Sequence, residues 1–189
     1  MLYITNQQVH REISFDDYQS LPGYSHSMIR MEGKAAFTPT AKMNVGTNVH
    51  NYLLTPKEYN HSDVSIIRPI AMELKGVIGN LWERLETELA VTADFNHGEF
   101  YLPYKGRIDA GIIKKVVIDF KIINGNSVRD TLDLFHYDTQ LSGYALGIAA
   151  EHAFIIAYSR KTKKVEVVPV KVDAGWWSMQ TTIKGKIKL

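Results

Sequence analysis

The chain has no cysteine among its 189 residues, and this absence removes several chemistries at once. Disulfides, cysteine zinc sites, thiol nucleophiles and cysteine-ligated iron-sulfur clusters all need a residue that the sequence lacks. Any metal ion must therefore be held by oxygen or imidazole ligands, and no iron-sulfur cluster is expected.

Long apolar runs and linker-like segments are also missing. No apolar stretch is long enough to span a bilayer, and the first residues lack the basic, apolar and small-residue pattern of a signal peptide, so we expect no membrane association and a cytoplasmic location. No internal repeat or Pro/Gly/Ser-rich tract divides the chain. With 45% hydrophobic residues, we expect a single domain over residues 1–189 with one core.

A strong excess of one charge is absent as well, because the formal net charge is only +2. Local clustering matters more than the total for nucleic-acid binding. The candidate DNA-binding cluster is a basic stretch containing Arg160, Lys161, Lys163 and Lys164. Taken alone, such a cluster is also what a solvated turn looks like.

Helical patterns are expected to fill the N-terminal part, about residues 1–90. Ser14 is placed to cap a short helix through Leu21, and Ser25 is placed to cap another through Met31. A third helix is expected over 44–54. Apolar residues at helical spacing predict a long amphipathic helix from Ala71 to Ala90.

The pattern then changes to short β-branched and aromatic runs, which predict a catalytic sheet and its helices over about 91–189. Three consecutive strands are expected in a meander, then two helices, two strands and a closing helix. In order, these are FYLPY, GRIDAGII and VVIDFKII, the helices Ser127 to Leu134 and Tyr137 to Ala149, the strands AFIIAYS and VEVVPVKV, and a helix from Trp176. The fold class is therefore α/β, a mixed sheet with helices on both faces.

Two carboxylates and a lysine are expected to converge within this sheet. In VVIDFKII the period of two puts Asp119 and Lys121 on one face, and a hairpin turn at Lys114-Lys115 brings Asp109 beside Asp119. Paired carboxylates can hold Mg²⁺, and a lysine can orient the attacking water or neutralise charge on phosphorus. The alternative is a polar strand face with a cross-strand salt bridge.

Two helices present further polar candidates. His50 shares a helix face with Gly46, four residues earlier, and can look into the sheet. Gln140 and Tyr144 project side by side from the stripe that faces the core, where an amide needs polar partners. A histidine or an aromatic stripe alone more often indicates core than a site.

Taken in order, GTNVHNYLL, EFYLPYKGRID, VIDFK and QLSGY resemble the motifs of PD-(D/E)xK nucleases of the RecB-like group, especially exonuclease VIII and lambda exonuclease. The resemblance implies a restriction-endonuclease-like α/β/α core holding one or two Mg²⁺ or Mn²⁺ ions. It implies metal ligation by His50, Asp109, Asp119 and the Phe120 carbonyl, with Glu99 as a candidate for a second metal. It places Lys121 at the attacking water and implies that Gln140 and Tyr144 support the catalytic site and contact DNA. Ser25 and Ser27 lie in a segment that matches the N-terminal part of the exonucleases, and they are expected to bind DNA.

The function implied by the resemblance is hydrolysis of DNA at its ends, as in phage-type recombination or repair inside a bacterial or phage-infected cell. DNA is the expected partner, with a single-strand annealing protein and a ring-shaped homo-oligomer as further expectations. A structure-selective or single-strand endonuclease and a catalytically silent DNA-binding module remain alternatives. A protein acting on a small phosphorylated ligand is disfavoured, because no glycine-rich phosphate loop is present.

Overall fold

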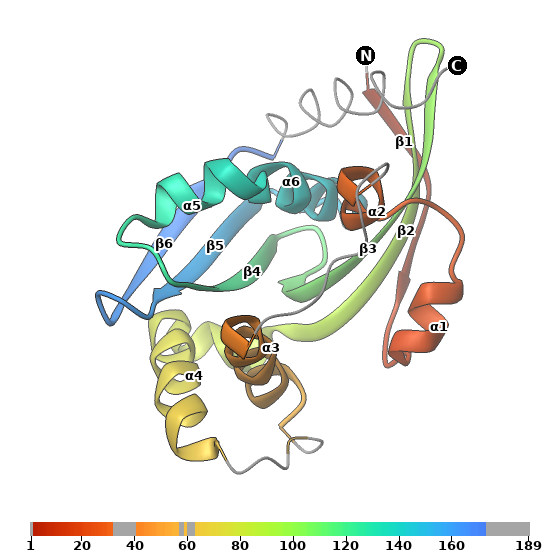
Figure 1. Ribbon diagram of the computed structural model, residues 1–189. Coiled ribbons are helices and arrows are strands. Elements are labelled where there is room, and N and C mark those ends of the chain that lie inside the picture. The colour runs from red at the N-terminus through yellow and green to blue at the C-terminus, as the bar shows by residue number, and fades with distance from the viewer. Residues whose placement is uncertain (1, 32–40, 57–58, 60–62, 173–189) are drawn as a thin grey trace.

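The computed structural model describes residues 2–31, 41–56, 59 and 63–172, which fold around a six-stranded mixed sheet (Figure 1). The strands are β1 (Leu2–His10), β2 (Glu86–His97), β3 (Phe100–Ile112), β4 (Val116–Ile123), β5 (His152–Ser159) and β6 (Lys164–Val170). The helices are α1 (Phe15–Ser20), α2 (His26–Met31), α3 (Ala41–Leu54), α4 (Val64–Ile78), the 3₁₀ turn η1 (Gly79–Arg84), α5 (Val128–Phe135) and α6 (Tyr137–Gly147).

The strands lie in the sheet in chain order, and every pairing is antiparallel except that of β4 with β5. A parallel pair needs a crossover connection, which α5 and α6 provide. The expected α/β class with a mixed sheet is therefore confirmed.

Two cores, one on each face, explain why the sheet is covered on both sides. Helix α6 packs Leu141, Tyr144 and Ala145 against one face, together with Ile29 of α2. Helices α3 and α4 pack against the other face, where their apolar residues meet those of β4 and β5; this core contains Val49, Leu53, Ile67, Leu74, Ile118, Phe120 and Ile156. Figure 1 shows α3 and α4 on the opposite side of the strands from α5 and α6.

The expectation of a helical N-terminal part is wrong at its beginning. Residues Leu2–His10 form β1, an edge strand paired antiparallel with β2. Its middle, from Thr5 to Gln8, is exposed and the register shifts there, so the segment has no clean alternation of apolar and polar residues. Pairing with β2 therefore determines its conformation.

The long helix expected from Ala71 to Ala90 is also wrong. Helix α4 begins earlier, at Val64, and ends at Ile78, because Gly79 follows with a φ of 60°. After η1 the chain becomes β2, in which Leu89 belongs to the core beneath α6, whereas Leu74 belongs to the core beneath α4. The apolar residues that suggested one helical stripe thus serve opposite faces of the sheet.

The segments expected as separate strands, FYLPY and GRIDAGII, form the single strand β3. β3 pairs with β2 along its length, but it pairs with β4 only from Ala110 to Ile112. On the N-terminal side of Ala110, from Asp109 back along β3, the two strands are no longer paired. Their divergence leaves room for side chains at the centre of the sheet.

Local signals for the short helices are confirmed. The Ser14 Oγ accepts a hydrogen bond from the Asp17 amide at 3.0 Å, and the Ser25 Oγ accepts one from the Met28 amide at 3.2 Å. The helix expected from Trp176 lies outside the described residues. Within the part of the chain that is described, no helix has the length and apolar character needed to cross a membrane.

Candidate functional site

Strand β4 carries Asp119 and Lys121, which the sequence predicts on one face of the strand. Val117 belongs to the core beneath α6, whereas Ile118 and Phe120 belong to the core beneath α3 and α4, so the alternation is confirmed. Asp119 is only 2% exposed. Its carboxylate is therefore almost entirely removed from water.

Asp109 reaches the site through an irregularity in β3. Ile108 lies in one core and Ala110 in the other, although a regular strand would put both on the same face. The opposing residue, Glu88, has a positive φ of 54°. The Asp109 Oδ2 accepts a hydrogen bond from the Phe120 amide at 2.8 Å. This side chain therefore provides the acceptor for a β4 amide at a position where the backbone of β3 no longer pairs with β4.

Asp119 and Lys121 form a buried ion pair, with Lys121 Nζ 2.5 Å from Asp119 Oδ2 and 4.8 Å from the centre of the Tyr137 ring. Burial raises the pKa of Asp119 to about 6; the Lys121 ammonium opposes this shift and the Asp109 carboxylate adds to it. Burial alone would lower the pKa of Lys121, but the Asp119 and Asp109 carboxylates outweigh it and raise that pKa. The lysine is therefore held as a cation.

His50 extends from α3 and joins the two strands. A carbonyl can only accept, so the contact of 2.8 Å between His50 Nε2 and the Phe120 carbonyl assigns the proton to Nε2. His50 Nδ1 then faces Asp109 Oδ2 at 3.5 Å. The Nδ1 atom and the Asp109 carboxylate therefore face the same space, where both could be ligands of one cation.

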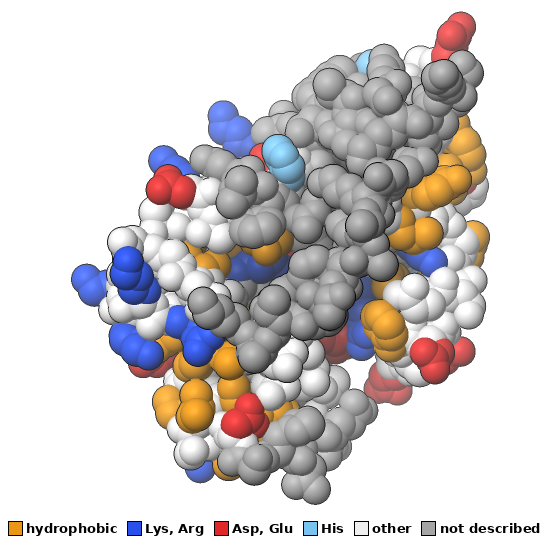
Figure 2. Space-filling view, viewed as in Figure 1, with side chains coloured by type: hydrophobic (Ala, Val, Ile, Leu, Met, Phe, Trp, Pro, Cys, Tyr) orange, Lys and Arg blue, Asp and Glu red, His pale blue; other side chains and the backbone are white. Residues whose placement is uncertain are grey.

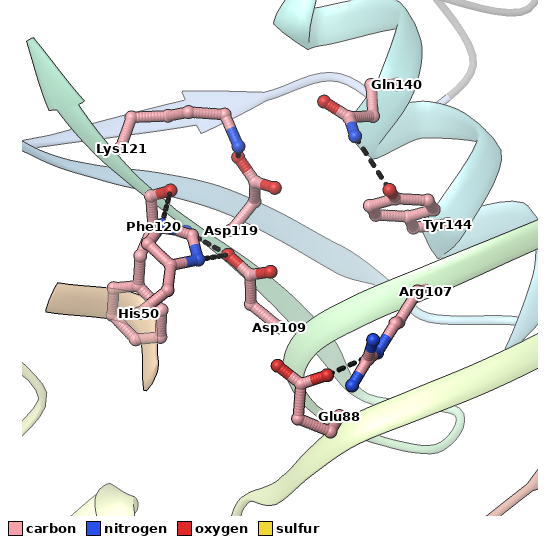
Figure 3. Close-up of polar contacts among 9 residues, drawn as sticks. All are labelled: His50, Glu88, Arg107, Asp109, Asp119, Phe120, Lys121, Gln140 and Tyr144. Atoms are coloured by element: carbon pink, nitrogen blue, oxygen red, sulfur yellow. Dashed lines mark hydrogen bonds and ion pairs between the residues drawn. The ribbon is translucent and has the colours of Figure 1, made fainter. Parts of the chain in front are cut away.

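Gln140 and Tyr144 lie on α6 as the helical stripe predicted. The Gln140 Nε2 donates a hydrogen bond to the Tyr144 hydroxyl at 2.7 Å. Burial, then the neighbouring Tyr104, Asp119 and Asp109, raises the pKa of Tyr144 well above its ordinary value. Figure 3 shows this pair facing the two carboxylates from the opposite side to His50.

A second ion pair, between Glu88 of β2 and Arg107 of β3, lies beside Asp109 (Figure 3). Burial raises the pKa of Glu88, although the Arg107 guanidinium opposes the shift. Sequence reasoning missed both residues, because the apolar pattern around Glu88 predicts a helix and so hides the strand that pairs with the segment of Arg107. If residues 86–97 had been predicted as a strand paired with β3, that pairing would have placed Glu88 opposite Asp109 and both residues near the site.

Other candidates stay apart from this centre. Glu99 is exposed in the turn between β2 and β3, roughly 30 Å along the strand from Asp109, so the structure does not bring it to the same metal. The Ser25 hydroxyl caps α2, and Ser27 is exposed on that helix. The basic cluster spans the turn between β5 and β6 and the first residue of β6, and the Arg160 amide in this turn donates to the Ile123 carbonyl. DNA binding by Ser25, Ser27 and the basic turn stays a prediction.

The donor set suits a hard divalent cation, since it combines carboxylate and carbonyl oxygens with one imidazole. The described residues nevertheless contain no group of three or more His, Asp or Glu side chains already gathered tightly enough to hold a metal. They form two separate pairs, Asp119 with Lys121 and His50 with Asp109. Asp119 Oδ2 is buried with no hydrogen bond beyond that ion pair, so it retains coordinating capacity.

No protein-family model matches the chain, and no curated protein sequence is significantly similar to it. Among solved structures, the chain is similar to the protein SSO0001, with 21% identity over 84% of this chain and 80% of that one, and a TM-score of 0.47. It is also similar to a phage-related exonuclease from Haemophilus somnus 129PT, with 18% identity, coverage of 79% and 78%, and a TM-score of 0.40. Likenesses of this strength do not bear on the activity of the chain.

Proposed function

We propose that the chain is a metal-dependent deoxyribonuclease of the PD-(D/E)xK type that hydrolyses phosphodiester bonds in DNA. The observation that carries the proposal is the convergence of His50, Asp109, Asp119 and Lys121 where β3 and β4 diverge. A salt-bridged strand face explains the pairing of Asp119 with Lys121. It does not explain why a second carboxylate and an imidazole from a helix both contact the backbone of Phe120.

The residues divide into metal ligands and groups that contact the substrate. His50, Asp109, Asp119 and the Phe120 carbonyl would hold one or two Mg²⁺ or Mn²⁺ ions. When bound, such an ion lowers the pKa of a water ligand and neutralises charge on the phosphate. Lys121, held as a cation by two carboxylates, orients the attacking water or stabilises the pentavalent phosphate. Gln140 and Tyr144 would support the site and contact the DNA strand, as the motif resemblance implies.

Exonuclease action on DNA ends is the finer part of the proposal, and it rests on the resemblance of the sequence motifs. A single-strand annealing partner and a ring-shaped homo-oligomer belong to the same proposal. An endonuclease built on the same core would differ only in the loops that limit access to the site. Cleavage of covalently closed circles separates the two modes.

The test is incubation of the purified protein with end-labelled linear and circular DNA, with EDTA, Mg²⁺ or Mn²⁺. We expect linear DNA to be degraded only when a metal is present. Asp119→Ala and Lys121→Ala are each expected to reduce the rate by at least about a hundredfold, because each removes a group that acts on the developing charge. Intact circles support the exonuclease, and cut circles support the endonuclease.

Folding must be controlled, because breaking a buried ion pair from one side costs about 3–5 kcal/mol. The double variant Asp119→Asn with Lys121→Met removes both charges together and so avoids an unpaired buried ion. We expect it to stay folded by circular dichroism and to be inactive. Cleavage by this folded variant at the wild-type rate, or no cleavage by the wild type with either metal, would show that the proposal is wrong.

A further inference from the structure

A pocket of about 320 Å³ opens beside Asp109, between α3 and the strands β2 and β3. Six of its seven lining residues have polar side chains, and two of them, His50 and Asp109, belong to the proposed centre; the residues are Gly46, Thr47, His50, Asn51, Glu88, Arg107 and Asp109. The pocket therefore adjoins the proposed metal site, and Figure 3 shows two of its lining residues, Glu88 and Arg107, beside Asp109.

The cationic group in this lining is Arg107. Arg107 and Asp109 are alternate residues of one strand that line the same pocket, so their Cα atoms are about 7 Å apart. That separation is close to the distance between neighbouring phosphates of a nucleic-acid strand. A phosphodiester bound at Asp109 would consequently place an adjacent phosphate near the guanidinium.

Arg107 is held ready in the free protein by two contacts. Its guanidinium pairs with the Glu88 carboxylate, and it lies over the Phe15 ring at 5.3 Å from the ring centre. The side chains of Arg107 and Glu88 are 30% and 24% exposed, so the pair is open to the pocket on one side.

We propose that Arg107 binds the phosphate next to the scissile one, and that Glu88 competes with this phosphate for the guanidinium in the free protein. The inference rests on the proposed nuclease function. The planar guanidinium donates two parallel hydrogen bonds to phosphate oxygens as readily as to a carboxylate, so one anion can replace the other. Thr47 and Asn51 supply neutral polar groups around the same space.

The exchange predicts effects of opposite sign for the two partners. Arg107→Gln is expected to weaken DNA binding about tenfold. It should also reduce the slope of log K against log salt concentration by about one, because one phosphate contact is lost. Glu88→Gln is expected to tighten binding several-fold, because the guanidinium loses its competing anion. A pair that only stabilises the fold would give weaker binding for both variants.

Binding is measured by fluorescence anisotropy with a labelled hairpin duplex that carries a single-stranded tail, in EDTA and in Ca²⁺, together with thermal unfolding. The double variant Glu88→Gln with Arg107→Gln removes both charges and should bind as weakly as Arg107→Gln while staying folded. The matched control is the exposed pair of Arg11 with Glu86, which also joins an arginine to a glutamate of β2. Changing either control residue to glutamine should leave binding unchanged.

The phosphate itself is identified with DNA carrying one neutral methylphosphonate linkage at successive positions. Next to the cleaved bond, this change should reduce cleavage by the wild type but cause no further loss in Arg107→Gln. Wild-type cleavage with equal methylphosphonate effects in both proteins overturns the pocket and leaves the nuclease standing. A wild-type protein that binds the hairpin without cleaving it overturns the nuclease and with it the assignment of a phosphate next to the scissile one; opposite shifts of Arg107→Gln and Glu88→Gln would then show only that Arg107 binds a DNA phosphate. A wild-type protein that does not bind the hairpin overturns both proposals.

Discussion

Gly106 shows at the scale of one residue how the site depends on a close approach of backbone and side chain. A Cβ atom at this position would lie 2.7 Å from two ring carbons of Tyr144 and 3.1 Å from the Tyr104 hydroxyl. The bare backbone thus receives the Tyr144 ring, and the ring hydroxyl in turn accepts the hydrogen bond from Gln140. Gly106 is therefore a positioning residue for the α6 side of the site.

Gly106→Ala should lower the free energy of unfolding by about 1–3 kcal/mol, because the buried ring must move to admit a methyl group. Cleavage should fall with it, since Gln140 and Tyr144 are displaced. Thermal unfolding and cleavage rates check both effects. Adding Tyr144→Leu should restore part of the stability without restoring cleavage.

Gly76 provides the control for this substitution. Among the described residues, a methyl group added at this position of α4 would meet no neighbouring atom within 4 Å. Gly76→Ala should raise the free energy of unfolding by up to about 1 kcal/mol through helix propensity alone, with cleavage unchanged. A Gly106→Ala protein that behaves like Gly76→Ala would contradict the role given to the Tyr144 ring.

Helix α3 is the element that brings an imidazole to the strands, and its composition lowers helix stability near the site. Gly46 precedes His50 by one turn and lines the pocket beside it. A Cβ at Gly46 would lie 3.8 Å from the Ile122 Cβ, which is an ordinary contact. Packing in the protein alone therefore does not require glycine there.

Gly46→Ala should consequently stabilise the protein by about 0.5–1 kcal/mol, because alanine is the better helix former. If the pocket holds a phosphate, the added methyl group should also narrow it and raise KM for DNA several-fold. Unfolding temperature and steady-state cleavage measure the two effects together. An unchanged KM with a higher unfolding temperature would mean that the pocket does not need the glycine.

At the scale of the whole molecule, one group of basic residues lies at the end of the sheet where β5 turns into β6. The turn between β5 and β6 carries Lys161 and Lys163, and Lys164 begins β6. Lys121 lies towards the same end of β4, because Ile123 pairs with Ser159. Figure 2 shows Lys and Arg side chains gathered over this edge of the molecule. A DNA strand leaving the site in this direction would meet the basic turn.

Replacing Lys163 and Lys164 by glutamine should weaken DNA binding uniformly across sequences and reduce the salt slope by up to about two. Lys114 and Lys115 form a matched control at the other end of β4, and both Lys114 and Lys163 have a positive φ. Their replacement should leave the slope unchanged. Titrations of the same DNA at several salt concentrations compare the pairs, and equal slopes would contradict the proposed path.

The features that could be predicted from the sequence are those that depend on nearby residues in the chain. The caps at Ser14 and Ser25, the helix presenting Gln140 and Tyr144, and the side of β4 that carries Asp119 all depend on neighbours a few residues apart. The same local signals failed for β1 and β2. Strand β1 is determined by pairing across the sheet, and the leucines of α4 and β2 fall at helical spacing while serving different cores.

The sequence by itself determined the residue types of the site and which strand or helix carries most of them. Only the tertiary structure decided that β3 and β4 part at Asp109, that His50 reaches the Phe120 carbonyl, and that Glu88 and Arg107 lie beside them while Glu99 does not. The physical reason is that alternation along a strand reports which face a side chain takes. The irregularity at Asp109 and the divergence of two paired strands depend on packing between elements distant in the chain.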